Sequence, residues 1–394
     1  MKLIHLSDLH IGKKLNEYPL LEDQEHILNQ IADIVEHEQP DAVLLAGDIY
    51  DKSVPSAEAV GLFDEFLFRL ADGQRKIFVI SGNHDSPERL AFGSRLMIPS
   101  GVHVAPVFAG PPAPVRIEGP GGAADIYMLP FVRPAHVRRY FPDEDIRSYN
   151  EAIRLIAESL PLDPDVKNIL VTHQFVAGAT LCESEDISVG GSEAVDASLF
   201  DAFDYVALGH LHSPQSVKRP QVRYPGSPLK YSFSEVSHQK SVTVLEWGED
   251  LDKDQSGTQA PPLEPQGEIA VRTVDLKPLR GMAELRGSYR DLMDRSFYRD
   301  RDTQAFIRVT LTDEQEIPGA MANLRIVYPH ILRLDYDNAR TRAGAVYLEA
   351  ERVRDKPPLE VFAEFYEKQN SAPLSEEGRG IVARAIEEIW EVRP

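Results

Sequence analysis

The chain has a single cysteine, Cys182, among its 394 residues. One thiol cannot close a disulfide within the chain, and such scarcity suits a reducing compartment. Long apolar runs are also missing, since the cleanest stretches, such as 42–46, are far too short to cross a membrane. His5 and Asp8 interrupt the opening residues where a signal peptide needs an apolar core. We therefore expect a soluble, cytoplasmic protein.

Basic side chains are scarce relative to acidic ones. The chain has 42 Lys and Arg against 63 Asp and Glu, which gives a formal net charge of −21. This charge repels polyanions over most of the surface, so composition alone weighs against a nucleic-acid partner. A small cationic or metal-loaded cleft can nevertheless bind phosphate within an acidic protein. The apolar fraction of 42% and charged fraction of 27% are those of a globular chain, which excludes disordered and fibrous classes.

Short apolar runs alternate with helical stretches from residue 1 to about 247, which is typical of an α/β domain. The runs predicted to be buried strands are 3–6, 42–46, 77–80, 126–129, 169–171 and 206–208. Polar clusters follow these strands. Because ligands in open α/β sheets bind beyond the carboxyl ends of the strands, the clusters predict one shared site.

The polar clusters supply carboxylate, imidazole and amide groups. They are Asp8-Leu-His10, Gly47-Asp48-Ile-Tyr-Asp51, Gly82-Asn83-His84-Asp85, Val171-Thr-His173 and Gly209-His210-Leu-His212. A dinuclear metal centre needs this mixture, because a carboxylate can bridge two ions and neutral imidazoles leave the ions Lewis-acidic. The absence of thiolate ligands favours manganese or iron over a structural zinc. Each cluster alone also fits an ordinary turn or surface residues, but their joint occurrence at strand ends argues against unrelated turns.

In this order, the clusters resemble the signature of calcineurin-like metallophosphoesterases. Within that superfamily, residues 1–340 resemble the SbcD nucleases, which work with the ATPase SbcC, and the tail is similar by position more than by motif. The resemblance is carried by Asp8-Leu-His-Ile-Gly-Lys13, Gly82-Asn-His-Asp-Ser-Pro-Glu-Arg89, Ala207-Leu-Gly-His-Leu-His212 and Tyr224-Pro-Gly-Ser227. It implies two central sheets flanked by helices, a small α/β capping domain and a C-terminal helical tail.

The resemblance also implies a role for each site residue. One divalent ion would be held by Asp8, His10 and His212, the other by Asn83, His173 and His210, with Asp48 bridging them. The two ions are expected to be Mn²⁺. His84 is expected to act as general acid or transition-state donor, with Asp51 accepting its hydrogen bond and fixing its tautomer. Asp85 suits a turn or supporting role, and the remaining histidines are expected to be structural.

The metal site alone does not distinguish DNA from smaller phosphate esters. Basic side chains are concentrated at 131–141 and at 218–223 with Lys230. They could bind a phosphate backbone near the metals, or they could be solvated charges on surface loops. Residues 271–308 hold nine basic and six acidic side chains, which also suits DNA. The resemblance implies a double-strand exonuclease and hairpin or single-strand endonuclease for DNA repair and recombination, and this is the function that we expect. One alternative is a phosphodiesterase or phosphatase that acts on nucleotides or phosphoproteins. Another is a scaffold that has the fold without the activity, but the complete set of ligand residues argues against it.

The chain is predicted to contain several parts. Residues 1–247 would form the nuclease domain, 248–268 a loop or linker, 269–340 the small domain, and 341–394 a connector with a helical tail. The small domain is predicted to have strands at 269–276, 305–311 and 331–334 and helices at 283–293 and 320–327. Amphipathic tail helices at 359–369 and 376–391 either pack on the chain itself or, as we favour, bind SbcC.

One further amphipathic stripe lies between Leu62 and Leu70. Its apolar residues fall on one helical face, which predicts either a core helix or a contact with a second copy. In the family that the chain resembles, helices beside the nuclease site form a dimer. The resemblance therefore implies a homodimer within a heterotetramer, with the stripe and the segment from Pro87 to Met97 at the dimer contact.

Overall fold

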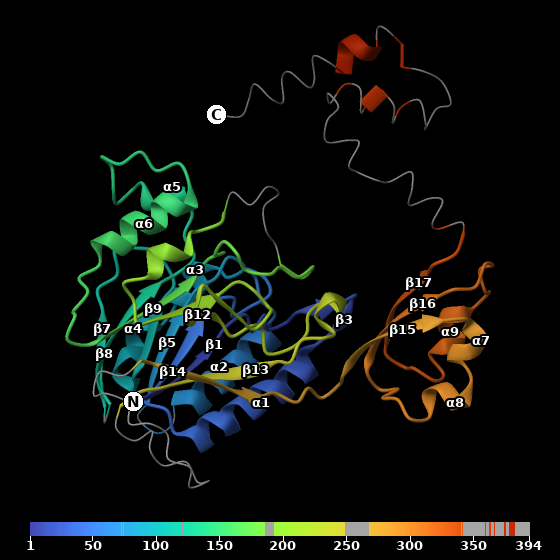
Figure 1. Ribbon diagram of the computed structural model, residues 1–394, viewed down its shortest axis with the longest axis horizontal. Coiled ribbons are helices and arrows are strands. Elements are labelled where there is room, and N and C mark those ends of the chain that lie inside the picture. Colours follow the sequence, from blue (N-terminus) through green and yellow to red (C-terminus); the bar gives the residue numbers. More distant parts are fainter. Residues whose placement is uncertain are drawn as a thin grey trace. The chain divides into compact units, whose positions relative to one another are not determined.

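A computed structural model shows the fold of the chain (Figure 1). It describes residues 1–185, 193–248 and 268–341 apart from positions 72, 74, 120 and 340, together with scattered positions between 359 and 382. No helix in these described parts is long and apolar enough to cross a membrane. The chain divides into two compact units, one of residues 1–285, 295–309 and 321–334, the other of 286–294, 310–320 and 335–394.

Two six-stranded sheets form the centre of the first unit. The first sheet has the order β14-β13-β1-β4-β5-β6, with β1 (Lys2–Leu6), β4 (Ala42–Ala46), β5 (Lys76–Ile80), β6 (Val102–Ala105), β13 (Ser241–Glu246) and β14 (Ala270–Asp275). The second has the order β11-β12-β10-β9-β8-β7, with β7 (Val115–Gly119), β8 (Gly122–Leu129), β9 (Lys167–His173), β10 (Tyr205–Gly209), β11 (Gln215–Val217) and β12 (Arg219–Tyr224). The strands predicted between residues 3 and 208 are confirmed.

Parallel pairing brings the polar clusters to one edge of each sheet. Strand β4 runs parallel to both β1 and β5, and β9 runs parallel to both β8 and β10. The register pairs Ala46 with Ile80 in the first sheet and Gly209 with His173 in the second. The loops that carry the predicted ligands therefore begin at the same level along neighbouring strands.

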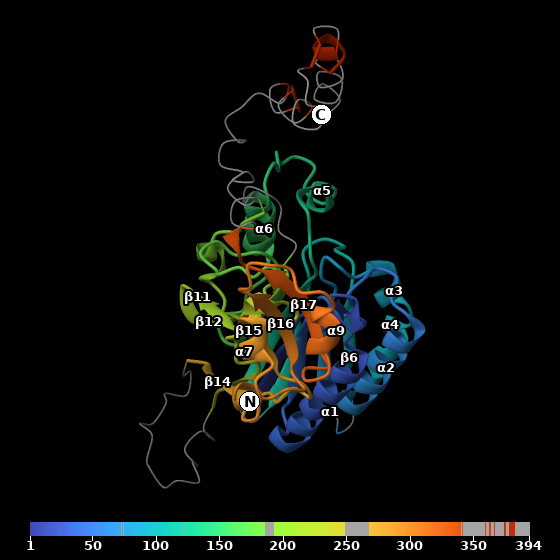
Figure 2. The ribbon, with the colours of Figure 1, turned by 90° about the vertical axis from the view of Figure 1, so that its right-hand side faces the viewer.

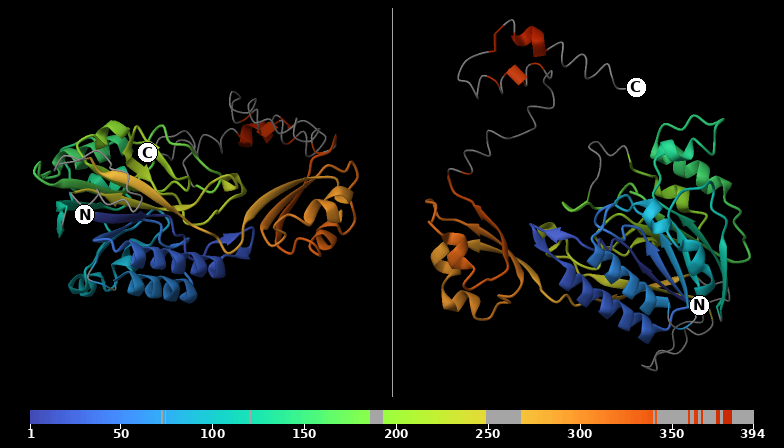
Figure 3. Two further views of the ribbon diagram at one scale, coloured as in Figure 1. Left: turned by 60° about the horizontal axis from the view of Figure 1, so that its bottom comes forward. Right: turned by 180° about the vertical axis from the view of Figure 1, so that it is seen from behind.

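Buried apolar side chains hold the sheets and helices together as layers. Between the sheets, Leu44 and Phe78 of the first share a core with Ile169 and Val171 of the second. Helices α1 (Leu21–Glu38) and α2 (Ala57–Ala71) cover the other face of the first sheet, and α6 (Tyr149–Ser159) covers the other face of the second. Figure 3 shows these layers, with α1 and α2 in blue and the second sheet with α6 in green. The predicted class, two central sheets flanked by helices, is confirmed.

Helix α2 contains the amphipathic stripe. Phe63, Phe66 and Leu70 are buried in the core shared with α1, so they are core residues and unavailable to a second copy. The expectation that the stripe as a whole forms a dimer contact is wrong for these three side chains, because the sheet beneath α2 already covers them. Phe68 of the same helix is 74% exposed and points away from this core.

The part of the chain after residue 268 differs from its predicted elements. Strand β14 pairs antiparallel with β13, so the strand predicted at 269–276 belongs to the first large sheet and not to the small domain. The helix predicted at 283–293 is wrong for its first half, where residues 283–287 belong to β15 (Met282–Gly287) and Leu285 is buried between more exposed neighbours. This alternation is the period of a strand, and it decides the local structure there. The second half of the predicted helix contains the short helix α7 (Tyr289–Leu292).

A separate three-stranded sheet has the order β15-β16-β17, with β16 (Phe306–Leu311) and β17 (Ile331–Tyr336). The strands predicted at 305–311 and 331–334 are therefore confirmed, as is a helix within 320–327. The remaining elements are β2 (Lys14–Leu15), β3 (Tyr18–Pro19), α3 (Pro87–Ala91), α4 (Ser94–Met97), η1 (Ile98–Ser100), α5 (Pro134–Val137), η2 (Ala197–Phe200), η3 (Phe233–Glu235), α7 (Tyr289–Leu292), α8 (Arg295–Tyr298) and α9 (Ala320–Leu324). Most of the linker predicted at 248–268 and of both tail helices lies outside the described residues, and the predicted domain boundaries stay predictions.

Candidate metal centre

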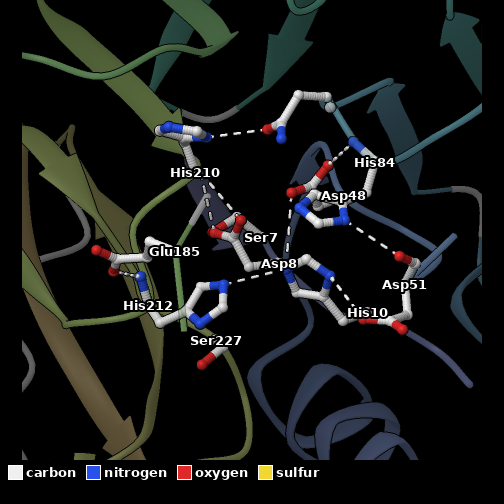
Figure 4. A network of polar contacts seen from close by, with 12 residues as sticks. Ser7, Asp8, His10, Asp48, Asp51, His84, Glu185, His210, His212 and Ser227 are labelled. Carbon is white, nitrogen blue, oxygen red and sulfur yellow. Dashed lines mark hydrogen bonds and ion pairs between the residues drawn. The ribbon is translucent and has the colours of Figure 1, made fainter. Parts of the chain in front are cut away.

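The loops that follow β1, β4, β5, β9 and β10 meet in one buried cluster (Figure 4). The main-chain N–H of His210 donates to the Asp8 carboxylate, 3.0 Å from Oδ1, and so connects the two sheets. The N–H of Asp8 donates to Gly47 O at 3.0 Å, and that of His10 donates to Asp48 O at 2.9 Å. The ligand loops of neighbouring strands are thus fixed to one another by main-chain hydrogen bonds.

Asp8, His10 and His212 form the first group of candidate ligands. One potential ligand atom of each lies within 4.8 Å of the others. The Nε2 atoms of His10 and His212 are only 3.0 Å apart. Burial lowers the pKa of both imidazoles, so each ring is neutral and offers a lone pair. These three residues are the set that the resemblance implies for one ion.

Asn83, His173 and His210 form the second group. The amide oxygen Oδ1 of Asn83 is 3.0 Å from His173 Nε2 and 2.9 Å from His210 Nδ1. The other ring nitrogen of His173, Nδ1, lies 2.8 Å from Ala46 O and donates to it. A hydrogen bond of this kind orients a histidine ligand and leaves Nε2 for a metal ion. Burial and the neighbouring His173 lower the pKa of His210 to about 3.

Asp48 lies between the two groups. Its Oδ2 atom is 3.6 Å from His10 Nε2 and 3.3 Å from His173 Nε2, while Oδ1 accepts the N–H of His84 at 2.9 Å. Burial opposes ionisation of Asp48, but the charge and the hydrogen bond of His173 outweigh burial and hold the pKa of Asp48 well below its usual value. Burial likewise lowers the pKa of His173, but the Asp48 carboxylate raises it to about 9. A carboxylate that faces one imidazole of each group has the geometry of a bridging ligand.

The donor set fits a divalent transition metal. Burial raises the pKa of Asp8 to about 7; His173 opposes this shift, and the nearby Asp48 carboxylate adds to it. Two buried carboxylates so close together need a compensating positive charge. Carboxylate, imidazole and amide donors without a thiolate are typical ligands for manganese or iron. The cluster therefore supports the binding of divalent metal ions.

Several ligands have a strained backbone. The ligands with φ in the left-handed region are Asp8 (54°), His10 (44°), Asp48 (51°) and His210 (108°). Such conformations cost about 1–3 kcal/mol each and are concentrated at functional sites. A Cβ on Gly82 would fall on the Asp48 carboxylate, and one on Gly209 would fall on the Ala46 carbonyl oxygen. These glycines therefore allow the ligand loops to approach one another closely.

His84 lies beside the first group. Its Nδ1 atom is 3.1 Å from the main-chain carbonyl oxygen of Asp51. The Asp51 carboxylate instead accepts from Lys13, with 2.7 Å between Oδ1 and Nζ. The expected hydrogen bond from His84 to Asp51 is present, and its acceptor is the main-chain carbonyl oxygen, while the carboxylate of Asp51 pairs with Lys13. A ring nitrogen of His84 also lies within 4.8 Å of ligand atoms of His10 and Asp48, so its role without metal binding stays a prediction.

Asp85 supports the loops without facing the cluster. Its carboxylate accepts from the main-chain N–H groups of Ile49 at 3.1 Å, Tyr50 at 2.9 Å and Gly82 at 2.9 Å. Burial raises its pKa to about 6, and Asp48 adds to this shift. Asp85 thus fixes the loop after β4 to the loop after β5, which is the supporting role expected from its place in the sequence.

The first basic stretch begins beside the second ligand group. The ring of Phe131 stacks on that of His210, with 6.5 Å between centroids, and the Arg133 guanidinium lies 5.9 Å from the Phe131 ring. The side chain of Arg133 is exposed. The charge of Arg133 therefore lies against the Phe131 ring, which itself stacks on the ligand His210.

The second basic stretch is occupied by contacts within the chain. Lys218 pairs with Asp201, and Arg219 donates to the Phe200 carbonyl oxygen at 3.1 Å. Since β12 runs parallel to β10, Arg219 at its first residue lies at the opposite end of the sheet from His210. Of the two interpretations of this stretch, this placement argues against phosphate binding beside the metals for Lys218 and Arg219.

Sequence reasoning did not identify several residues that contact the ligand residues through atoms other than the metal-binding ones. Gln24 of α1 donates to His10 O at 2.7 Å, and its own amide oxygen accepts from Gly12 N at 2.9 Å. Ser184 and Glu235 lie beside the Nδ1 atom of His212. These side chains occur singly, outside any motif, so no pattern in one sequence indicates them.

Comparison with known proteins agrees with this geometry. Residues 1–214 match the family described as calcineurin-like phosphoesterase, and residues 278–370 match the type 5 capsule protein repressor C-terminal domain. The D subunit of the nuclease SbcCD from Staphylococcus epidermidis (strain ATCC 12228 / FDA PCI 1200) is 33% identical over 383 residues, which cover 95% of each chain. With this domain and this cluster, the protein is a metal-dependent phosphodiester hydrolase. The chain belongs to the calcineurin-like phosphoesterases and, within them, to the SbcD family.

Proposed function

We propose that this protein is a DNA nuclease with a centre for two divalent metal ions. The observation that carries the proposal is the position of Asp48, whose Oδ2 lies 3.6 Å from an imidazole of the first group and 3.3 Å from one of the second. The similarity to a named nuclease subunit, which extends over 95% of both chains, supports DNA as the substrate. The activities proposed are exonuclease cleavage of duplex ends and endonuclease cleavage of hairpins and single strands.

The side chains around the centre would share the work of hydrolysis. Two bound ions would supply Lewis acidity for in-line attack of water on phosphorus. Because Nδ1–H of His84 donates to the Asp51 carbonyl oxygen, Nε2 is the nitrogen left for the substrate. In the imidazolium form Nε2 also carries a proton, and we assign to this N–H the hydrogen bond that would stabilise charge on the phosphate or leaving oxygen. Arg133 would bind the phosphate backbone next to the second ion.

Manganese is the metal that we propose for both sites. Imidazole and amide ligands in the two groups suit Mn²⁺ better than Mg²⁺, which is small and hard and keeps several water ligands. The carboxylates Asp8 and Asp48 are ligands that both ions accept. Replacement of Mn²⁺ by Mg²⁺ should therefore lower the activity at equal metal concentration.

We further propose two protein partners. The first is a second copy of this chain, which would cover the exposed side chains of Phe68, Phe92 and Leu96, with exposures of 74%, 89% and 84%. Figure 2 shows α2, α3 and α4, the elements around these residues, on the same side of the first sheet. The second partner is an SbcC-type ATPase, which would bind residues 341–394 in a heterotetramer within the cytoplasm. The match of residues 278–370 to a family-specific C-terminal domain supports this assignment.

One assay separates the nuclease from the alternative phosphodiesterase. The purified protein is incubated with linear duplex DNA, hairpin DNA and a panel of nucleotides and phosphopeptides, with Mn²⁺ and with a chelator. We expect Mn²⁺-dependent cleavage of both DNA substrates and little release of phosphate from the panel. Hydrolysis of nucleotides or phosphopeptides without cleavage of DNA would overturn the proposal.

A further inference from the structure

The imidazole of His212 has two different surroundings at its two nitrogen atoms. Nε2 faces His10 Nε2 at 3.0 Å, which is the side of the candidate ion. Nδ1 faces Ser184 Oγ at 2.8 Å on the opposite side of the ring. A histidine binds a metal through its unprotonated nitrogen, so Nδ1 must carry the proton if Nε2 is the ligand atom.

The contacts of Ser184 set the direction of this hydrogen bond. Its Oγ also lies 2.7 Å from Glu235 Oε1, and Glu235 is completely buried. A carboxylate only accepts hydrogen bonds, so the single hydroxyl hydrogen of Ser184 goes to Glu235. The lone pairs of Ser184 Oγ are then left to accept the proton of His212 Nδ1.

Lys240 keeps Glu235 in its charged form. Its Nζ atom lies 2.6 Å from Glu235 Oε2, 2.7 Å from His212 O and 2.9 Å from Ser227 Oγ, so all three ammonium hydrogens have acceptors. Both Lys240 and Glu235 are buried, so loss of either partner would leave the other as an uncompensated buried charge. The pair therefore holds the acceptor for Ser184 in one place.

A second contact attaches the same loop to the main chain of His212. The Glu185 carboxylate accepts from the N–H of His212 at 2.7 Å and from the N–H of Cys182 at 2.7 Å. Residues 182–185 thus hold both the ring and the backbone of one candidate ligand. Figure 4 shows Glu185 next to His212, on the far side of that residue from His10.

We propose that Ser184 and Glu235 are positioning residues for the first metal ion. Glu235, held by Lys240, orients the Ser184 hydroxyl, and Ser184 fixes His212 in the tautomer with Nδ1–H and its Nε2 lone pair toward the ion. The arrangement is a carboxylate–histidine–metal relay with a serine hydroxyl inserted between carboxylate and imidazole. The inference rests on the assignment of His212 as a metal ligand in the proposed function.

Metal titration of the whole protein tests the proposal. Metal-stripped wild type and Ser184→Ala are titrated with Mn²⁺ by calorimetry, and free Mn²⁺ is followed by electron paramagnetic resonance. We expect Ser184→Ala to weaken binding of one ion by about 10–100-fold and to leave the other unchanged. Ser184→Thr, which keeps the hydroxyl, should restore the wild-type affinity. Ser234→Ala is the matched control, because Ser234 contacts the same loop at Glu183 N but not His212.

Histidine nitrogen spectra give a second readout that a merely structural role would not change. The spectra are recorded on metal-stripped protein labelled with ¹⁵N-histidine, and the signals of His212 are assigned through His212→Gln. They should show protonation at Nδ1 in the wild type and a mixture of tautomers in Ser184→Ala. Glu235→Gln should produce the same mixture, with folding checked by thermal unfolding. Wild-type affinity for both ions in Ser184→Ala, or protonation of His212 at Nε2 in the wild type, would overturn the proposal. Failure of the wild type itself to bind Mn²⁺ would instead refute the proposed metal centre.

Discussion

The Nδ1 atom of His84 faces the main-chain carbonyl oxygen of Asp51 at a distance of 3.1 Å. The orientation of this imidazole thus depends on the backbone after β4 and not on an acidic side chain. The Asp51 carboxylate is occupied by Lys13, 2.7 Å away. Substitution of His84 and substitution of the Asp51 side chain should therefore have different effects, although the sequence alone suggests that both would disturb the same hydrogen bond.

We predict that His84→Ala lowers kcat by about 10²–10⁴-fold, because it removes a donor to the reacting phosphate without removing a predicted ligand. Metal content and affinity for DNA should stay close to the wild type. Asp51→Asn keeps the carbonyl acceptor and should reduce kcat by less than about tenfold. Steady-state kinetics with metal analysis checks both variants. Loss of one bound ion in His84→Ala would identify His84 as a ligand instead.

A homodimer contact should depend on the exposed apolar residues after β5. We predict that Phe92→Asp together with Leu96→Asp produces a monomer, because each exposed ring or isobutyl group would be replaced by a charge within a covered interface. Sedimentation velocity measures the mass. Ile326→Asp, at a side chain that is 79% exposed elsewhere, is the control and should leave the mass unchanged. Equal mass for the double variant and the wild type would exclude this surface as the interface.

The C-terminal tail should serve partner binding and not catalysis. We predict that deletion of residues 359–394 abolishes binding to the SbcC-type ATPase, because the amphipathic stripes that the sequence predicts would be lost. Mn²⁺-dependent cleavage of simple DNA by the isolated protein should stay close to the wild type. Co-purification and a nuclease assay measure the two effects separately. Undiminished binding by the truncated protein would assign the partner surface to another part of the chain.

A buried histidine between the sheets should make the protein sensitive to acid. Burial and the charge of Arg223 lower the pKa of His5 to about 3, while an unfolded chain has the ordinary value of 6.5. As the pH falls below 6.5, the unfolded state binds a proton that the folded state does not, so the free energy of unfolding decreases. The contribution of this group is about 1.4 kcal/mol per pH unit in that window.

His5→Gln tests this pH dependence, because glutamine still offers a polar partner to the Tyr205 hydroxyl, which lies 3.0 Å from His5 Nδ1. Urea unfolding of the metal-stripped protein is measured between pH 6 and pH 4. We expect the wild type to lose more stability than His5→Gln over this interval. Parallel curves for the two proteins would show that His5 does not titrate as described.

The sequence predicted the sheets and the ligand cluster because both depend on local patterns. A buried strand reads as an apolar run, and the clusters from Asp8 to His212 follow such runs directly. A helix was predicted for the first half of the stretch 283–293 because several of its residues favour helices. The burial of Leu285 in a sheet decides the structure there instead. Local propensity is a weak guide when tertiary contacts compete with it.

Contacts between residues far apart in the chain could not be predicted from the sequence. Ser184 and Glu235 are 51 residues apart and meet only because both lie behind His212. The acceptor for His84 is a carbonyl group, which every residue has, so no residue type could indicate it. The pairing of Lys218 with Asp201 likewise depends on how the chain folds around the end of β12.

If two metal ions bind on either side of Asp48, the number of bound ions and the cleavage of DNA should depend on each other. Metal-stripped protein is titrated with Mn²⁺ while bound metal and cleavage of linear DNA are recorded together, for the wild type and for Asp48→Ala. We expect two ions per chain, activity that reaches its maximum only when both are bound, and no cleavage by Asp48→Ala. Full activity of the metal-stripped protein, or wild-type activity of Asp48→Ala in Mn²⁺, would exclude the two-metal centre.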